Sequence, residues 1–320
     1  MRGYPNWSAG DDLLIREGAL SETFRATHFT QACCDSLPRF NRGLSWLAWA
    51  YNEEGLIAAY LRRANELLQR TVEDYEIIVV DDGSTDRTPS ILKGLAEQIP
   101  SLRIVTNEIN RNVGYSCRRA IMAASKEYLM WQTVDWSYDI TMLRAFLELL
   151  KAHDVVAGVR RAPVAQANRV HRVVGGLLRI FGIKHITRRS DTIPKALVSV
   201  INYLLVRVLF RVPLSDFQNV CIYPTGLIQS IDKEANSSFL NPEMLIKAYW
   251  SGCSIVEVPI SFIPRQAGHA KGTRLRAIQA SVRDIFRLWF KWIVLGKREL
   301  RDKGKVRRLI PAEWPPDTLS

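Results

Sequence analysis

Acidic residues follow two apolar runs in the first half of the chain. Asp81 and Asp82 come directly after residues 77–80, and Asp135 follows the run that begins at residue 128. Carboxylates at a strand end can accept hydrogen bonds from nucleobase and ribose groups, and a carboxylate can hold Mg²⁺ or Mn²⁺ on a diphosphate. The alternatives are a solvated turn for the pair and a helix-capping acid for Asp135. We favour ligand binding for Asp81 and Asp82 and leave both interpretations of Asp135 open.

Three other polar clusters admit both a binding and a structural interpretation. Tyr51 and Glu53 follow the apolar run at residues 44–50 and could frame a base, although Asn-Glu is also an ordinary helix start. Asp86 precedes a proline-containing helix start and is favoured as a cap. Residues 265–272 combine arginine, lysine and glycines, which suits phosphate binding as well as a flexible basic loop. The role of each cluster depends on the elements that position it.

Short apolar runs alternate with helical patterns from residue 44 onward. The predicted strands are 44–50, 77–80, 102–108, 127–135 and 153–160, and the predicted helices are 57–70, 89–99, 114–125 and 141–151. This alternation predicts an α/β fold with a doubly wound, mostly parallel sheet flanked by helices. In such sheets ligands bind at the carboxyl ends of the strands, which is where the polar clusters of the first half fall.

The remainder of the chain has weaker patterns. Residues 1–42 show no sustained periodicity and are expected to form an irregular extension. Apolar residues at helical spacing run through 197–208, short strand-like runs occupy 215–264, and 277–294 has the pattern of an amphipathic helix with a basic face. No uncharged apolar stretch reaches the roughly 18 residues of a membrane-spanning helix, so none is predicted.

Positive charge is concentrated late in the chain. The net charge is +12, and residues 151–211 hold 12 basic against 2 acidic side chains, while residues 266–320 hold 13 against 5. Such segments attract phosphate-bearing partners, among which nucleic acid ranks last because no RNA- or DNA-binding motif occurs. Five cysteines without a CxxC spacing, and the lack of a secretory signal, favour a reducing cytosolic setting without disulfides or zinc.

The order of these motifs resembles glycosyltransferase family 2, which has the GT-A fold. Tyr-Asn-Glu-Glu at 51–54 is followed by Val-Val-Asp-Asp-Gly-Ser-Thr-Asp at 79–86 and then by the strand end that carries Asp135. The later motifs are Asp-Phe-Gln at 216–218, Asn-Pro-Glu-Met at 241–244, Glu-Val-Pro-Ile at 257–260, and Arg265 with Gly268 and Lys271. They narrow the resemblance to the polyprenyl-phosphate sugar transferases, with dolichyl-phosphate mannose synthase as the best-known member. The similarity covers about residues 44–275.

This resemblance implies an inverting transfer of a sugar from a UDP- or GDP-sugar to a polyprenyl phosphate. The residues that it assigns to nucleotide-sugar binding are Trp49, Tyr51, Glu53, Val80, Asp81, Asp82 and Thr133. The resemblance further implies that Asp135 and Ser137 hold Mg²⁺ or Mn²⁺, and that Asp135 acts with three cations in catalysis. Those cations are Arg160, Arg265 and Lys271, which would approach the donor and acceptor phosphates. A phosphate nucleophile is already anionic, so catalysis would rest mainly on positioning and charge stabilisation.

Two departures from the family pattern change these expectations. The metal motif is commonly Asp-x-Asp followed two residues on by Gln, whereas Thr133 and Ser137 stand at the first and last of these positions. Hydroxyl groups are weaker metal ligands than carboxylates, so we expect weaker or altered metal binding. Trp49 stands where proline is usual, which predicts a different base pocket.

The expected organisation has three regions: an irregular extension at 1–42, a GT-A glycosyltransferase domain at 43–265, and a basic amphipathic C-terminal segment at 266–320. Residues 276–295 are expected to lie on an anionic membrane surface, anchored by Trp289 and Trp292, with a core-packed helix as the alternative. The predicted location is cytoplasmic, peripheral on the inner face of a membrane. A membrane-protein partner or a homo-oligomer is left open. Transfer to a glycan or small molecule, and a degenerate nucleotide-sugar binder or membrane scaffold without turnover, are the alternative functions.

Overall fold

The computed structural model describes residues 37–161, 193–217, 219–261, 263, 275–298 and 302–308. Its centre is one eight-stranded sheet in the order β3-β2-β1-β4-β6-β5-β7-β8, in which only β6 runs antiparallel to its neighbours. The strands are β1 (Leu44–Ala50), β2 (Tyr75–Asp81), β3 (Leu102–Thr106), β4 (Tyr128–Trp131), β5 (Val155–Arg161), β6 (Cys221–Pro224), β7 (Ser254–Ser261) and β8 (Lys305–Arg308). The predicted mostly parallel α/β fold is confirmed.

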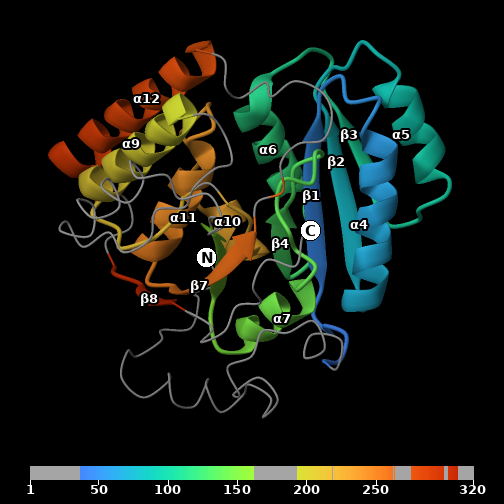
Figure 1. Cartoon of the computed structure of the whole chain (residues 1–320), viewed down its shortest axis with the longest axis horizontal. Helices are drawn as coiled ribbons and strands as arrows, with labels where there is room; N and C mark the ends of the chain where they lie inside the picture. Colours follow the sequence, from blue (N-terminus) through green and yellow to red (C-terminus); the bar gives the residue numbers. More distant parts are fainter. Residues whose placement is uncertain are drawn as a thin grey trace.

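Helices cover both faces of this sheet (Figure 1). On one face lie α4 (Ile57–Thr71), α5 (Thr88–Ala96) and α7 (Leu143–Glu148), which continues into the 3-10 turn η1 (Leu149–Lys151). On the other face lie α6 (Asn112–Ala123), α9 (Ile193–Phe210), α10 (Thr225–Ser230), α11 (Leu240–Trp250) and α12 (Leu275–Trp289), which continues into the π-helical turn η4 (Phe290–Val294). Two hydrophobic cores therefore sandwich the sheet.

The central strand β1 shows why an unbroken apolar run was readable as a strand. Trp46 and Ala48 belong to the core beneath α4, whereas Leu47 and Trp49 face the core beneath α6. Side chains alternate across a strand, so a strand covered on both faces is apolar at nearly every position. The polar exception, Ser45, is buried and donates its hydroxyl to Glu76 at 2.7 Å. The predicted bounds of 44–50 agree with the structure for this reason.

The prediction of short strand-like runs for residues 215–264 is wrong for half of that segment. Only β6 and β7 are strands, while α10 and α11 are helices. Ten of the eleven residues of α11 are buried. A helix buried all round has no polar face, so it lacks the periodicity that identifies a surface helix.

The described part of the C-terminal segment packs against the sheet and its hydrophobic core. β8 pairs with β7 and completes the sheet, and α12 buries Ile285, Leu288 and Trp292 in the core beneath α6 and α11. Trp292 has an exposed fraction of only 1% and donates its indole N–H to Glu234 at 2.9 Å. The prediction that Trp292 anchors the chain in a membrane interface is therefore wrong, because its ring packs against Phe210 and Trp250.

None of the described helices is both long and apolar enough to cross a membrane.

Candidate active site

The carboxyl ends of β1, β2 and β4 meet at one edge of the sheet. Ala50 pairs with Asp81 in the register of β1 and β2, and the N–H of Asp82 donates to the carbonyl of Ala50 at 2.8 Å. On the other side of β1, the N–H of Gln132 donates to the carbonyl of Leu47 at 3.2 Å. The polar loops that follow these three strands therefore begin side by side, as the sequence predicted.

The loops after β1 and β2 are bonded to each other. The N–H of Asn52 donates to the Ser84 hydroxyl at 3.0 Å, and the N–H of Thr85 donates to the Asn52 side-chain carbonyl at 2.8 Å. The N–H of Glu53 donates to the Thr88 hydroxyl at 2.9 Å. Asn52 adopts a positive φ of 50°, which asparagine tolerates better than most residues. These reciprocal bonds fix the shape of the pocket edge that carries Tyr51 and Glu53.

Asp86 completes this connection as a structural residue. Its carboxylate accepts the N–H of Thr88, the first residue of α5, at 2.9 Å and the N–H of Glu54 at 3.2 Å. Burial raises the pKa of Asp86, but hydrogen bonds from the Thr88 side chain and from both backbone groups outweigh it, so the pKa lies below its ordinary value. The interpretation of Asp86 as a helix-capping acid is supported by these contacts.

Asp81 and Asp82 are both buried, with exposed fractions of 2% and 5%. Asp81 accepts the N–H of Ser84 at 3.1 Å, which closes the tight turn after β2. Asp82 accepts the Asn107 side-chain amide at 2.7 Å and the N–H of Arg111 at 2.9 Å, both through Oδ1. The pair therefore also shapes the loops around it, a structural role that exists alongside the predicted ligand-binding one.

The loop after β4 is a compact turn around Asp135. The N–H of Trp136 donates to the Thr133 carbonyl at 2.9 Å, and the N–H of Ser137 donates to the Thr133 hydroxyl at 3.2 Å. The Ser137 hydroxyl in turn donates to Asp135 Oδ1 at 2.6 Å. Thr133 thus closes the turn, and Ser137 orients the carboxylate.

An aromatic cluster supports this turn from below. Trp136 adopts a φ of 53°, which is rare for a bulky residue, and its ring stacks on Trp46 at a centroid distance of 5.8 Å. Tyr60 packs edge-on against Trp136 at 5.7 Å and donates its hydroxyl to the Gln132 carbonyl at 3.1 Å. The guanidinium of Arg63 lies 4.3 Å from the Trp136 ring centroid. Packing therefore holds a strained backbone beside Asp135.

Sequence reasoning missed Trp136, Tyr60 and Asn107 as parts of this site. Tyr60 lies on the helical face that the periodicity identified, yet periodicity shows only that a residue is buried, and not that its hydroxyl supports a loop after β4. The unusual φ of Trp136 has no sequence signal, because glycine or asparagine would be expected at a positive φ. Asn107 follows β3 directly, whereas the sequence predicted a strand through residue 108 and so placed Asn107 inside it.

Of the other predicted site residues, some lie within the described part of the chain and some lie outside it. Trp49 is half-buried against the α6-side core, and Val80, its partner in the β1–β2 register, is fully buried there. Val80 is therefore a core residue of β2, one position before the Asp81–Asp82 pair. Arg160 lies near the carboxyl end of β5, parallel with β7, whereas Arg265 and Lys271 lie outside the described residues.

The residues around Asp135 offer one carboxylate as a ligand for a divalent cation. No group of three or more His, Cys, Asp and Glu side chains occurs within the described part of the chain. Mg²⁺ and Mn²⁺ nevertheless bind through one or two carboxylates plus substrate phosphates, so a single carboxylate suffices when a diphosphate supplies the other oxygens. Asp135, with the adjacent Ser137 hydroxyl, is the donor set available here.

Curated relatives match the chain over part of their own length. Glycosyltransferase AglD of Haloferax volcanii is 26% identical over 258 residues, which are 77% of this chain and 36% of AglD. An undecaprenyl-phosphate 4-deoxy-4-formamido-L-arabinose transferase of Enterobacter sp. is 41% identical over 73 residues, which are 23% of this chain and 21% of that protein. The chain thus spans about a third or less of these relatives.

Solved structures share the fold at low sequence identity. Glucosyl-3-phosphoglycerate synthase of Mycobacterium tuberculosis, in complex with Mn²⁺, UDP and glucosyl-3-phosphoglycerate, has a TM-score of 0.51 at 16% identity and covers 91% of this chain and 86% of its own. A mannosyltransferase of Pyrobaculum calidifontis, in complex with GDP-Man and Mn²⁺, has a TM-score of 0.52 at 14% identity and covers 89% and 79%. These likenesses confirm the GT-A type of α/β fold.

The sequence model described as "Glycosyl transferase family 2" matches residues 45–207, slightly more than half of the 320 residues. That span contains the loops after β1, β2 and β4, and therefore the whole edge of the sheet at which the acidic residues meet. The chain belongs to glycosyl transferase family 2.

Proposed function

We propose that this protein transfers a sugar from a nucleotide-sugar donor to a polyprenyl phosphate. The observation that carries the proposal is the meeting of the Tyr51–Glu54 loop, the Asp81–Asp82 pair and Asp135 at one sheet edge, within the span matched by the family. Relatives named as undecaprenyl-phosphate transferases support the acceptor, and neighbours solved with UDP or GDP-Man and Mn²⁺ support the donor and the metal.

The donor nucleoside would lie against the loops after β1 and β2. Tyr51 offers a ring for stacking, and Glu53, Asp81 and Asp82 offer carboxylate oxygens for base and ribose groups. The bonds that tie these loops to Ser84, Asn107 and neighbouring backbone exist without the donor, so little ordering is required when it binds. Trp49 and Thr133 would border the same pocket.

The reaction would exchange one phosphate oxygen for another at the sugar C1 atom. The acceptor phosphate oxygen forms a bond to C1 while the bond from C1 to the diphosphate breaks, which inverts the configuration and releases the nucleoside diphosphate. Both phosphates are anionic before and after, so no proton transfer is needed. Asp135 and Ser137 would hold the divalent cation that neutralises the diphosphate, and the predicted cations Arg160, Arg265 and Lys271 would neutralise the two phosphates.

A direct assay tests this proposal. The protein is incubated with UDP- and GDP-sugars, Mg²⁺ or Mn²⁺, and detergent-dispersed polyprenyl phosphate, and lipid-linked sugar is measured. We expect lipid-linked product with at least one donor, and none when the metal is removed by a chelator. Transfer only to soluble glycans or small molecules would replace the acceptor assignment, and donor binding without any turnover would leave a nucleotide-sugar binder.

The predicted organisation and location belong to the same proposal. The catalytic domain would occupy residues 43–265, with the extension 1–42 before it and the basic segment 266–320 after it. A lipid acceptor requires that the enzyme works at a membrane surface, and the proposed location is the cytoplasmic face. Limited proteolysis followed by mass spectrometry would test the N-terminal boundary, since cleavage within the 43–265 core at the rate of residues 1–42 would contradict it. α12 and β8 pack against this core and are expected to resist cleavage with it.

A further inference from the structure

Helix α12 and the turn η4 carry a second apolar row that faces away from the protein. The inner face is formed by Ile285, Leu288 and Trp292, which are all buried. The outer row is formed by residues spaced four apart, with exposed fractions of 39%, 45%, 51% and 52% for Val282, Phe286, Phe290 and Val294. We call these four residues the α12 apolar row. Residues four apart on a helix lie above one another, so the row is a continuous strip.

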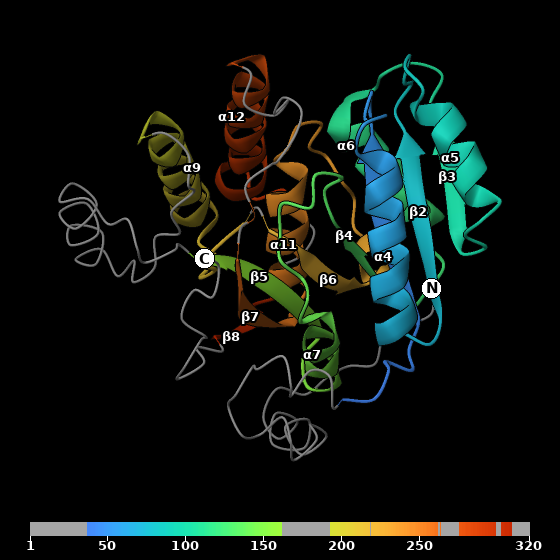
Figure 2. The same cartoon turned by 45° about the vertical axis from the view of Figure 1, so that its right-hand side comes forward.

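Helix α9 lies beside α12 and also carries exposed apolar residues. The two helices are neighbours in both views (Figures 1 and 2), and they make direct contact. Ile201 and Val208, two turns apart on α9, have exposed fractions of 53% and 68%. Exposed apolar residues that form a continuous strip, as in the α12 apolar row, indicate an interaction surface, unlike isolated ones.

The exposed charged side chains next to the row are arginines. Residues 275–298 contain six Lys and Arg side chains and a single acid, Asp284. Asp284 is buried and accepts the backbone N–H groups of Asn236 and Ser237 at 3.0 and 3.1 Å. Arg283 and Arg287 are exposed immediately next to Val282 and Phe286, although Arg287 also pairs with Asp284. An apolar row bordered by cations is complementary to an anionic lipid surface.

A second copy of this chain fits the same face poorly. In a two-fold symmetric dimer the same patch contacts itself, so the arginines of one α12 would meet those of the other, while Asp284, the single acid of residues 275–298, is buried. Anionic headgroups supply the missing negative charge, and acyl chains accept the phenylalanine rings. Charge complementarity therefore favours lipid over a second protomer.

We propose that the α12 apolar row, with Arg283 and Arg287 beside it, binds the surface of an anionic lipid bilayer. The biological role of this binding rests on the proposed function, because the proposed acceptor, a polyprenyl phosphate, lies in a lipid bilayer. Binding itself requires neither donor nor turnover. The face that enters the lipid is the Phe286 and Phe290 side of α12, and the buried Trp292 side remains in the protein core.

Co-sedimentation with vesicles tests this surface. The full chain is mixed with phosphatidylcholine vesicles, with or without phosphatidylglycerol, at low and high salt, and the bound fraction is measured. We expect binding to the anionic vesicles that is released by salt, and an about tenfold weaker affinity for the double variant F286S/F290S and for R283E. Met122→Ser, at an exposed apolar residue of α6, is the matched control and should bind like the unaltered protein.

Two controls keep the outcomes separate. Circular dichroism and thermal unfolding of each variant show whether it folds, and light scattering shows whether F286S/F290S turns a dimer into a monomer. Equal vesicle binding by folded F286S/F290S and R283E, or a dimer that these variants dissociate, would overturn the lipid surface. Transfer to detergent-dispersed acceptor is measured in parallel: normal transfer without vesicle binding refutes only this inference, and vesicle binding without transfer refutes only the proposed function.

Discussion

Asp82 is held in position by the protein itself before any ligand arrives. Its Oδ1 atom accepts one bond from Asn107 and one from the Arg111 backbone, and Asn107 also bonds to the Ser116 hydroxyl at 3.0 Å. A carboxylate fixed by protein donors loses little further freedom on binding a nucleoside. The acid therefore shapes the loop after β3 through Oδ1, and the proposed nucleoside contact would use its second oxygen.

Gly83 sets the geometry of this turn. It adopts a φ of +71°, and a Cβ atom there would lie 2.5 Å from the Ile109 carbonyl carbon, which is backbone and cannot move aside cheaply. We expect Gly83→Ala to lower the free energy of unfolding by about 2 kcal/mol or more, measured by urea denaturation. Gly94→Ala is the control, because nothing lies within 4 Å of its Cβ position. In the last turn of α5 that substitution should stabilise by about 0.5–1 kcal/mol. Equal effects at the two glycines would contradict the close approach.

Asp135 is the only carboxylate that the proposed metal site retains. Asp135→Asn keeps an oxygen that can accept the Ser137 hydroxyl but removes the negative charge. We expect turnover to fall by about 10²-fold or more, with the free energy of unfolding changed by less than about 1 kcal/mol. Initial rates of sugar transfer with saturating Mn²⁺ measure the first, and urea denaturation measures the second. Full activity in this variant would remove Asp135 from the mechanism.

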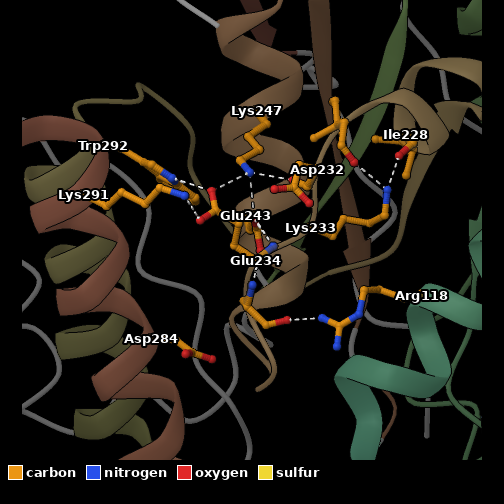
Figure 3. Close-up of polar contacts among 12 residues, drawn as sticks. Arg118, Ile228, Asp232, Lys233, Glu234, Glu243, Lys247, Asp284, Lys291 and Trp292 are labelled. Atoms are coloured by element: carbon orange, nitrogen blue, oxygen red, sulfur yellow. Dashed lines mark hydrogen bonds and ion pairs between the residues drawn. The ribbon is translucent and has the colours of Figure 1, made fainter. Parts of the chain in front are cut away.

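At the scale of elements, the loop between α10 and α11 connects the C-terminal helix to α6 (Figure 3). Glu234 accepts the Trp292 indole and a charged bond from Lys291, while Lys247 donates to the Asp232 carbonyl at 2.6 Å. From the opposite side, Arg118 of α6 donates to Asn236 Oδ1 at 2.6 Å. This network connects α6 and η4, the continuation of α12, to the same loop, so the two helices share a support.

The stability of this junction should depend on pH. Burial raises the pKa of Glu234, but hydrogen bonds from Lys291 and Trp292 and the charge of Lys247 outweigh it, so the pKa lies below its ordinary value of 4.5. The carboxylate therefore stabilises the fold above pH 4.5, and this contribution is lost as the pH falls through the lowered folded-state pKa.

Glu234→Gln tests this dependence. We expect the variant to be less stable than the unaltered protein near neutral pH, and the difference to shrink as the pH falls below 4.5. Urea denaturation at a series of pH values measures it. Glu73→Gln, at an exposed carboxylate, is the control and should follow the unaltered protein throughout. A gap between Glu234→Gln and the unaltered protein that stays constant with pH would show that the contacts are steric and not ionic.

The elements differ in how far their sequence reveals them. β1 could be predicted because it is a short apolar run that is buried on both faces. α4 could be predicted because its apolar residues recur at helical spacing on one face. α11 could not, since burial on all sides removes the stripe, and β8 could not, since its four residues are mostly basic. Trp136 shows the same limit at the site: its φ and its stacking on Trp46 depend on residues far away in the chain.

At the scale of the whole molecule, the parallel order of the sheet makes the site. Eight strands place the ends of β1, β2 and β4 at one edge, and a single antiparallel strand, β6, separates them from β5. The sequence motifs predicted this edge because parallel strands end on the same side. They did not predict that the C-terminal segment would extend the sheet through β8, because that pairing joins parts of the chain without a local pattern.

The most direct test of the central claim is a crystal structure of the full chain soaked with GDP or UDP and Mn²⁺. We predict a nucleoside against the loops 51–54 and 81–86 and an anomalous Mn²⁺ peak within about 2.2 Å of an Asp135 carboxylate oxygen. The diphosphate should bridge the two. A nucleotide bound elsewhere on the molecule, or a Mn²⁺ ion on the diphosphate without contact to Asp135, would contradict the assignment of this sheet edge as the donor site.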